Sequence, residues 1–252
     1  MKTVLSRFWK ETTVLLRSVP AVLVGLLLIA VVAMNLLANK SINLGVNWLA
    51  LDCGIVFSWL IFLVMDITTK RFGVKAANTL TILALLVNLL LVLLFLACSY
   101  IPGEWSQSYV EGSEGVINEA LDMTFRSSWF VILGCSVAFV VSAFVNNVLN
   151  RLIYKAFRKD NFIAFSVSSY VSTFIGQFVD NLLFALIVSL HFFGWSIVQC
   201  LTCAVTGAVA ELLFEVVFSP LGYRFVRRME RDKVGQEYLD LINGGIKDES
   251  IG

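Results

Sequence analysis

The stretch that decides the fold runs from Ser166 to Phe184 and reads SVSSYVSTFIGQFVDNLLF. It lies within an apolar run long enough to cross a bilayer, yet it contains the carboxylate Asp180. On a helix, residues at steps of three and four share one face, which here carries Ser166, Ser169, Thr173, Gln177, Asp180 and Phe184. An acid at mid-bilayer depth costs at least about 2.5–3.5 kcal/mol. We therefore expect this polar stripe to face other helices or a hydrated chamber.

The composition indicates an integral membrane protein. The chain of 252 residues is 58% hydrophobic and only 15% charged, whereas soluble domains are usually about one quarter charged. The five cysteines lie in or beside apolar segments and are odd in number, so no disulfide framework is expected. The sequence contains no P-loop, a single histidine (His191) and no recognisable nucleophile–base set. We expect a protein that is not an enzyme and has no cofactor or metal site.

Six apolar segments reach the roughly 17–25 residues that a spanning helix needs. They are predicted near 18–38, 48–67, 76–100, 128–149, 163–190 and 195–219. The predicted fold class is therefore an all-α integral membrane protein with six transmembrane helices. Its membrane domain covers 18–222, preceded by a cytoplasmic segment at 1–17 and followed by a cytoplasmic tail at 223–252.

The cations are sorted along the chain in a way that predicts its orientation. Only Lys40 and Arg126 lie on one side of the predicted spans, and the other 17 of the 19 cations lie on the opposite side. Cytoplasmic loops carry such an excess of Lys and Arg, so both termini are expected in the cytoplasm of a bacterial inner-membrane protein. The loop 101–127 is then external, either solvated or folded as a lid, and 113–125 is predicted to form a short amphipathic helix.

The second segment carries three notable side chains at seven-residue spacing, Asp52, Trp59 and Asp66, which would share one helix face. Each acid is either an interfacial helix-end residue or part of an inward-facing site. Trp59 falls at mid-depth, where tryptophan is less favoured than at the interfaces, so it either packs against other helices or stacks on a flat ligand.

Polar residues in the fourth and sixth segments extend this pattern. Ser142, Asn146 and Asn150 follow at four-residue steps and are expected to hydrogen-bond to neighbouring helices. Glu211 and Glu215 lie one helical turn apart, so at least one should be neutral or paired with a cation such as Arg224. Buried titratable acids in a helix bundle are typical parts of a proton relay.

Three stretches resemble the queuosine precursor transporters, also called the vitamin uptake transporter family. They are FSWLIFLVMDITTKRFG with Asp66, STFIGQFVDNLLF with Gln177 and Asp180, and ELLFEVVFSPLGYRFV with Glu215. The resemblance extends from about Asn35 to Met229. Two positions differ from the family pattern, because Glu211 stands where many members have a lysine and Asn181 where they have threonine.

The resemblance implies a six-helix bacterial inner-membrane transporter that takes up 7-deazaguanine bases such as preQ0 and preQ1. Such a base is flat and presents N1–H and a 2-amino group, two donors that one carboxylate can accept together. The predicted substrate-binding residues are Trp59, Gln177, Asp180, Asn181, Phe184 and Glu211. The proton-coupling candidates are Asp66, Glu211 and Glu215.

The expected partners are the small-molecule base and the lipid bilayer, without nucleic acid, and the sequence leaves a homodimer open. A different function remains as an alternative at this stage. The chain would then be the substrate-binding membrane subunit of a multi-component uptake system that a separate ATPase energises.

Overall fold

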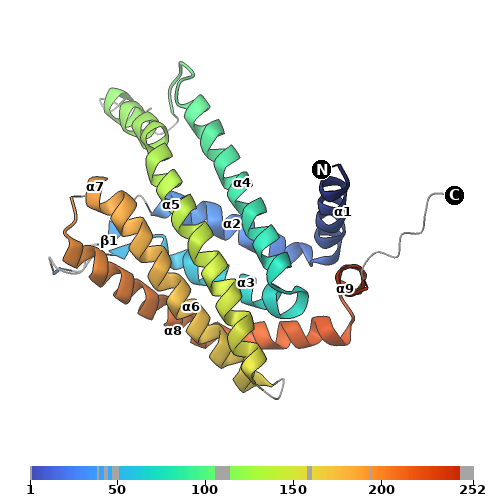
Figure 1. The fold of residues 1–252 in the computed structure, drawn as a ribbon. Helices are drawn as coiled ribbons and strands as arrows, with labels where there is room; N and C mark the ends of the chain where they lie inside the picture. The colour runs from blue at the N-terminus through green and yellow to red at the C-terminus, as the bar shows by residue number, and fades with distance from the viewer. Residues whose placement is uncertain are drawn as a thin grey trace.

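The computed structural model describes residues 2–38, 40–42, 45–46, 51–105, 114–157, 161–192 and 194–244. The chain is almost entirely helical, with one small hairpin (Figure 1). In order, the elements are α1 (Lys2–Ser18), α2 (Ala21–Leu37), β1 (Ser41–Ile42), β2 (Leu51–Asp52), α3 (Ile55–Phe72), α4 (Val74–Cys98), α5 (Glu114–Ala156), α6 (Phe162–Phe184), the π-helical turn η2 (Ala185–Ser189), α7 (Leu190–Phe192), α8 (Ile197–Arg231) and α9 (Gln236–Asn243).

Four helical stretches of the described chain are long and apolar enough to cross a membrane: Val74–Cys98, Gly115–Ala156, Phe162–Phe192 and Ile197–Arg231. A fifth results if α1 and α2, which are bent by 101° at their junction, count as one span. The remaining predicted span, α3, has 18 residues and carries Asp66, Lys70 and Arg71. The all-α membrane class is confirmed, and the count of six spans and the orientation of the termini stay predictions.

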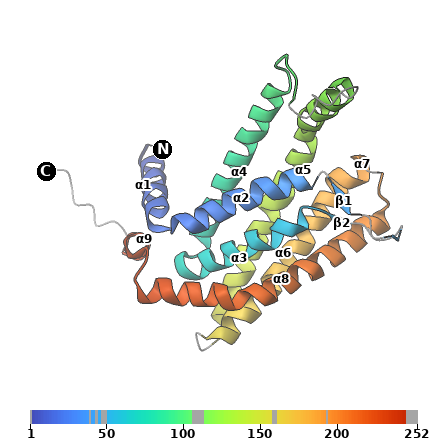
Figure 2. The same cartoon turned by 180° about the vertical axis from the view of Figure 1, so that it is seen from behind.

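The centre of the bundle is α3, which contacts α2, α4, α5, α6 and α8. Its middle turns are buried on every side, from Ile61 to Thr69. A helix that is buried all round lies in the core rather than at a lipid-facing edge. Seen from behind, α2, α3 and α8 run alongside one another, with the β1–β2 hairpin and α7 at one end and α1 and α9 at the other (Figure 2).

Two predicted elements differ from the structure. The second segment was predicted as a helix over 48–67, but Leu51 and Asp52 pair with Ile42 and Ser41 in the hairpin, and α3 begins at Ile55, while 48–50 lie outside the described residues. Asp52 therefore does not share a helix face with Trp59 and Asp66. The predicted amphipathic helix at 113–125 is not separate either, since α5 continues without a break from Glu114 to Ala156. No glycine or proline interrupts 116–133.

An ion-paired cluster holds α1 against the end of the bundle where α4 begins. The carboxylate of Glu11 accepts from Lys75 Nζ at 2.5 Å and from Arg7 Nε at 3.0 Å. Burial alone would raise the pKa of Glu11, but the two cations hold that pKa below its ordinary value. Glu11 therefore stays ionised at neutral pH, and the contact becomes weaker only as the pH falls through this lowered pKa.

Close backbone approach on the buried face of α6 depends on Gly176. A Cβ placed there would lie 2.7 Å from the Phe62 ring on α3 and 3.0 Å from the Asn146 Cβ on α5. Neither neighbour is the free end of a flexible chain. The glycine therefore lets three helices meet at the level of Gln177.

We expect Gly176→Ala to lower the free energy of unfolding by about 1–3 kcal/mol, as overpacking in a filled core usually does. Gly25→Ala is the matched control, because a Cβ at Gly25 on α2 meets nothing within 4 Å. That control should be neutral or up to about 1 kcal/mol more stable. Thermal unfolding of the purified protein in detergent compares the two, and equal transition temperatures would contradict the packing described here.

Candidate functional site

The polar stripe of α6 faces the protein interior, as its spacing predicted. Ser169, Thr173 and Gln177 are fully buried, and Asp180 is 8% exposed. The opposite face of the same helix carries Val167, Val171 and Ile175, each more than a third exposed. The stripe lies between α5 and α8, which contact α6 along most of its length.

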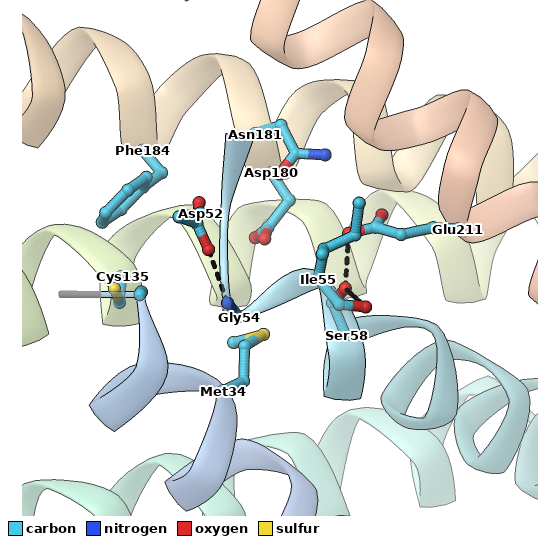
Figure 3. A pocket seen from close by; sticks show the side chains of 11 residues that line it. Met34, Asp52, Gly54, Ile55, Ser58, Cys135, Asp180, Asn181, Phe184 and Glu211 are labelled. Atoms are coloured by element: carbon cyan, nitrogen blue, oxygen red, sulfur yellow. Dashed lines mark hydrogen bonds between the residues drawn. The ribbon is translucent and has the colours of Figure 1, made fainter. Parts of the chain in front are cut away.

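A narrow pocket lies at the hairpin end of this stripe (Figure 3), and its empty volume of about 340 Å³ includes solvent outside its mouth. Five parts of the chain meet around it: the end of α2, the link from β2 to α3, and helices α5, α6 and α8. The lining residues are Met34, Ala38, Asp52, Gly54, Ile55, Ser58, Cys135, Asp180, Asn181, Phe184 and Glu211.

Three carboxyl groups line the pocket from three different elements, and each is held by a neutral donor. Asp180 Oδ1 accepts from Ser142 Oγ at 2.7 Å, and Glu211 Oε1 accepts from Ser58 Oγ. Asp52 Oδ1 accepts from the Gly54 N–H at 2.7 Å. Among the described residues, none of the three forms an ion pair. The pocket is therefore acidic and has acceptor capacity left for a ligand with several donors or a positive charge.

Asp52 also shapes the chain at this point. Its bond to Gly54, two residues on, closes the turn between β2 and α3, as Asp and Asn side chains do in Asx-turns. The turn places the Asp52 carboxyl beside the pocket. Figure 3 shows it on the same side as Phe184, with Asp180 between it and Glu211.

A second acidic cluster lies deeper in the bundle, three turns of α6 away from Asp180. Asp66 on α3 and Glu215 on α8 are fully buried, and the hydroxyl of Ser169 on α6 contacts both carboxyls. Asn146 Nδ2 on α5 also donates to Asp66 Oδ1 at 2.9 Å. Asp66 is thus a core residue rather than an interfacial acid, and Glu215 bonds to Ser169 rather than to Arg224.

Thr173 and Gln177 occupy the stretch of α6 between the two acidic sites. Both are fully buried, and Thr173 Oγ1 and both amide atoms of Gln177 lack a hydrogen-bond partner within the described structure. Buried polar atoms are nearly always satisfied by protein or water. These groups are therefore suited to hold water or a ligand between the sites, although Gln177 does not itself line the pocket.

Trp59 does not line the pocket. Its ring stacks on Phe218 at 4.5 Å and on Phe214 at 5.6 Å between ring centroids, and both partners belong to α8. Its indole N–H donates to the Val56 carbonyl at 2.8 Å. Of the two interpretations of this side chain, the structure shows packing against a neighbouring helix. The aromatic side chain at the pocket is Phe184.

One family model matches the chain, over residues 52–225, and it describes a putative vitamin uptake transporter. The match covers more than half of the sequence and every helix from α3 to the greater part of α8.

The chain belongs to the vitamin uptake transporter family.

The resemblance to the vitamin uptake transporter family is thereby confirmed over residues 52–225, and the queuosine precursor as substrate stays a prediction. The matched region of this vitamin uptake transporter contains all the carboxyl groups of both acidic sites, whereas α1, α2 and α9 lie outside it. No curated protein and no solved structure matched the chain in the corresponding searches. The family assigns the transporter class and places several apolar helices in a membrane.

Sequence reasoning missed part of the transporter's pocket. Met34 and Ser58 line it, but no spacing or charge distinguishes them from the other apolar and small residues of their helices. Asp52 was predicted to lie near a membrane surface on a helix. The glycine two residues after it, Gly54, is the sequence signal that would have predicted a turn there instead. Ser142 was expected to bond a neighbouring helix, and it does so by holding Asp180.

The two roles of Asp52 can be separated by substitution. Asp52→Asn keeps the side-chain oxygen that accepts from Gly54, so we expect stability close to that of the unchanged protein. Asp52→Ala removes the acceptor and should cost about 0.5–1.5 kcal/mol, the net contribution of a typical hydrogen bond. Thermal unfolding measures both, and an alanine variant as stable as the asparagine variant would show that the turn does not depend on Asp52.

Proposed function

We propose that this protein imports a purine-like base, of the 7-deazaguanine class, across the bacterial plasma membrane. The observation that carries the proposal is the pocket of Figure 3, where Asp52, Asp180 and Glu211 converge without a cation. Such a pocket repels anions. It favours a ligand with donors on one edge or a positive charge.

Three of the pocket residues can contact a deazaguanine directly. Asp180, held in place by Ser142, accepts N1–H and the 2-amino group together, a paired arrangement that is both strong and specific. Phe184 offers a ring face against the flat base, and Asn181 offers an amide to its carbonyl group. Trp59 does not contact the base, because its ring stacks on Phe218 of α8.

The number of acids favours one of the two candidate bases. One carboxylate is enough for the donor edge of the base, which leaves Asp52 and Glu211 for a second feature. The aminomethyl group of preQ1 is a cation, whereas the nitrile of preQ0 is neutral. We therefore expect preQ1 to bind more tightly, with its aminomethyl cation near Asp52 or Glu211.

The direction of transport follows from the predicted orientation. With both termini in the cytoplasm, the hairpin end of the bundle, which lies opposite α1 and α9 (Figure 2), faces outward, and the pocket lies next to it. A buried acid pair farther along α6 lies on the inward side. We therefore take protons as the coupling ion, since buried titratable acids are the usual parts of a relay.

The decisive variant is Asp180→Asn, measured with purified protein in vesicles that contain no ATP and no other protein. Losing a charged hydrogen-bond partner costs about 1.5–3 kcal/mol, so preQ1 binding should weaken by roughly 10- to 150-fold and uptake should fall accordingly. Trp59→Phe is the control and should keep both.

Normal membrane insertion of Asp180→Asn must accompany the loss. Uptake at the unchanged rate would remove Asp180 from the site. An intact protein that binds preQ1 but accumulates none without a separate ATPase would support the alternative of a substrate-binding subunit.

A further inference from the structure

The deeper acidic cluster contains a hydroxyl placed between two carboxyl groups. Ser169 Oγ lies 2.7 Å from Glu215 Oε1 and also contacts Asp66 Oδ2. A serine hydroxyl has one hydrogen to donate, and an ionised carboxylate only accepts. Both contacts are hydrogen bonds only if one of the two carboxyls carries a proton and donates it to Ser169 Oγ. The geometry therefore contains one proton shared by two acids through a hydroxyl.

The charged groups around the cluster also indicate that the two carboxyl groups share one proton. From α3, the cation Lys70 lies close enough to act on both carboxyls, and it donates to Asn150 Oδ1 at 2.7 Å and to Ser168 Oγ at 2.6 Å. From α5 the cluster receives the neutral Asn146, and from α6 the neutral Ser169. On α8, the next acid is Glu211, which is bonded to Ser58 at the pocket.

Two carboxyls with one proton have a charge of −1, and Lys70 brings the total to zero. With both carboxylates ionised, one negative charge would remain uncompensated in the core, where charges are costly to bury. With both protonated, Lys70 would be the uncompensated charge. The neutral state therefore holds one proton, and it keeps one carboxylate able to accept a second.

The cluster is separate from the pocket but connected to it. Ser169 and Asp180 are eleven residues apart on α6, roughly 16 Å at 1.5 Å per residue. The side chains between them on the same face are Thr173 and Gln177, whose unsatisfied polar atoms suit a short file of water. The cluster can thus respond to a ligand at Asp180 without touching it.

We infer that Asp66, Ser169 and Glu215 form the coupling site of this transporter and hold a single exchangeable proton. The positive charge of Lys70 makes this one-proton state electrically neutral. Glu211 belongs to the base pocket instead. During transport, a proton from outside binds the free carboxylate and one proton leaves to the cytoplasm, so that the cluster returns to its neutral state. This inference rests on the proposed function for its transport role. The proton count stands independently of it.

The first experiment needs no substrate. The infrared spectrum of the purified protein should show a protonated-carboxyl band at neutral pH that is lost or shifted in both Asp66→Asn and Glu215→Gln. Lys70→Met should increase that band, because a second proton is then needed for neutrality. A band unchanged in both acid variants would overturn the inference, as would an unchanged band in a correctly folded Lys70→Met protein.

The second experiment tests coupling in vesicles. For exchange, preQ1 is present on both sides of the membrane, and for accumulation it is added outside only. Ser169→Ala should keep base binding and base exchange at equal pH, and should reduce accumulation driven by a pH gradient at least tenfold. Ser169→Thr retains the hydroxyl and should restore accumulation. Ser172→Ala is the matched control, since that buried hydroxyl of the same helix donates only to the Ser169 backbone carbonyl.

The outcomes separate the two proposals. If the intact protein binds no deazapurine, the proposed function fails, and the infrared result still decides whether the cluster holds a proton. If a sodium gradient drives accumulation without a pH gradient, the cluster binds Na⁺ and the inference is overturned. Full gradient-driven accumulation by Ser169→Ala would also overturn it.

Discussion

Everything in this structure depends on burying carboxyl groups in an apolar bundle without cations beside most of them. The penalty for an ionised acid in such surroundings is several kcal/mol unless hydrogen bonds or a proton offset it. Here the offset comes from small neutral donors on neighbouring helices: Ser58 for Glu211, Ser142 for Asp180, and Asn146 and Ser169 for Asp66. Each donor is short, so it fixes its carboxyl and occupies little of the space that a ligand needs.

The arrangement divides the acids into two groups with different surroundings. At the hairpin end, Asp52, Asp180 and Glu211 line free space, and their unused oxygen atoms can contact a ligand. Deeper in the bundle, Asp66 and Glu215 face each other across one hydroxyl, where there is room for protons but not for a base. Both groups are joined by one helix, α6. A change in its position therefore alters both sites together.

The sequence predicted the parts of this architecture that depend on periodicity. The inward face of α6, the all-helical membrane class and the family all follow from residue spacing and short motifs, and the serine–asparagine steps of α5 were expected to bond neighbouring helices. It could not predict which acid each donor serves, because that depends on how the helices are rotated against one another. It also missed the β1–β2 hairpin, since two-residue strands have no detectable alternation and residues 47–50, outside the described chain, continue the apolar pattern of α3. Trp59 shows the same limit, because its stacking partners lie more than 150 residues away on α8.

The Glu11 contact with Lys75 makes the two ends of the bundle mechanically unequal. At that end, one ion pair joins α1 to α4, and α1 also contacts α9, so the first and last helices pack together there. At the opposite end, the pocket lies beside a hairpin of two residue pairs and the turn that Asp52 forms with Gly54. The hairpin contributes neutral hydrogen bonds at its end, whereas the other end pairs the buried carboxylate of Glu11 with the largely exposed cation of Lys75. The two ends of the bundle therefore differ in what holds them, a charged contact at one end and a few neutral hydrogen bonds at the other.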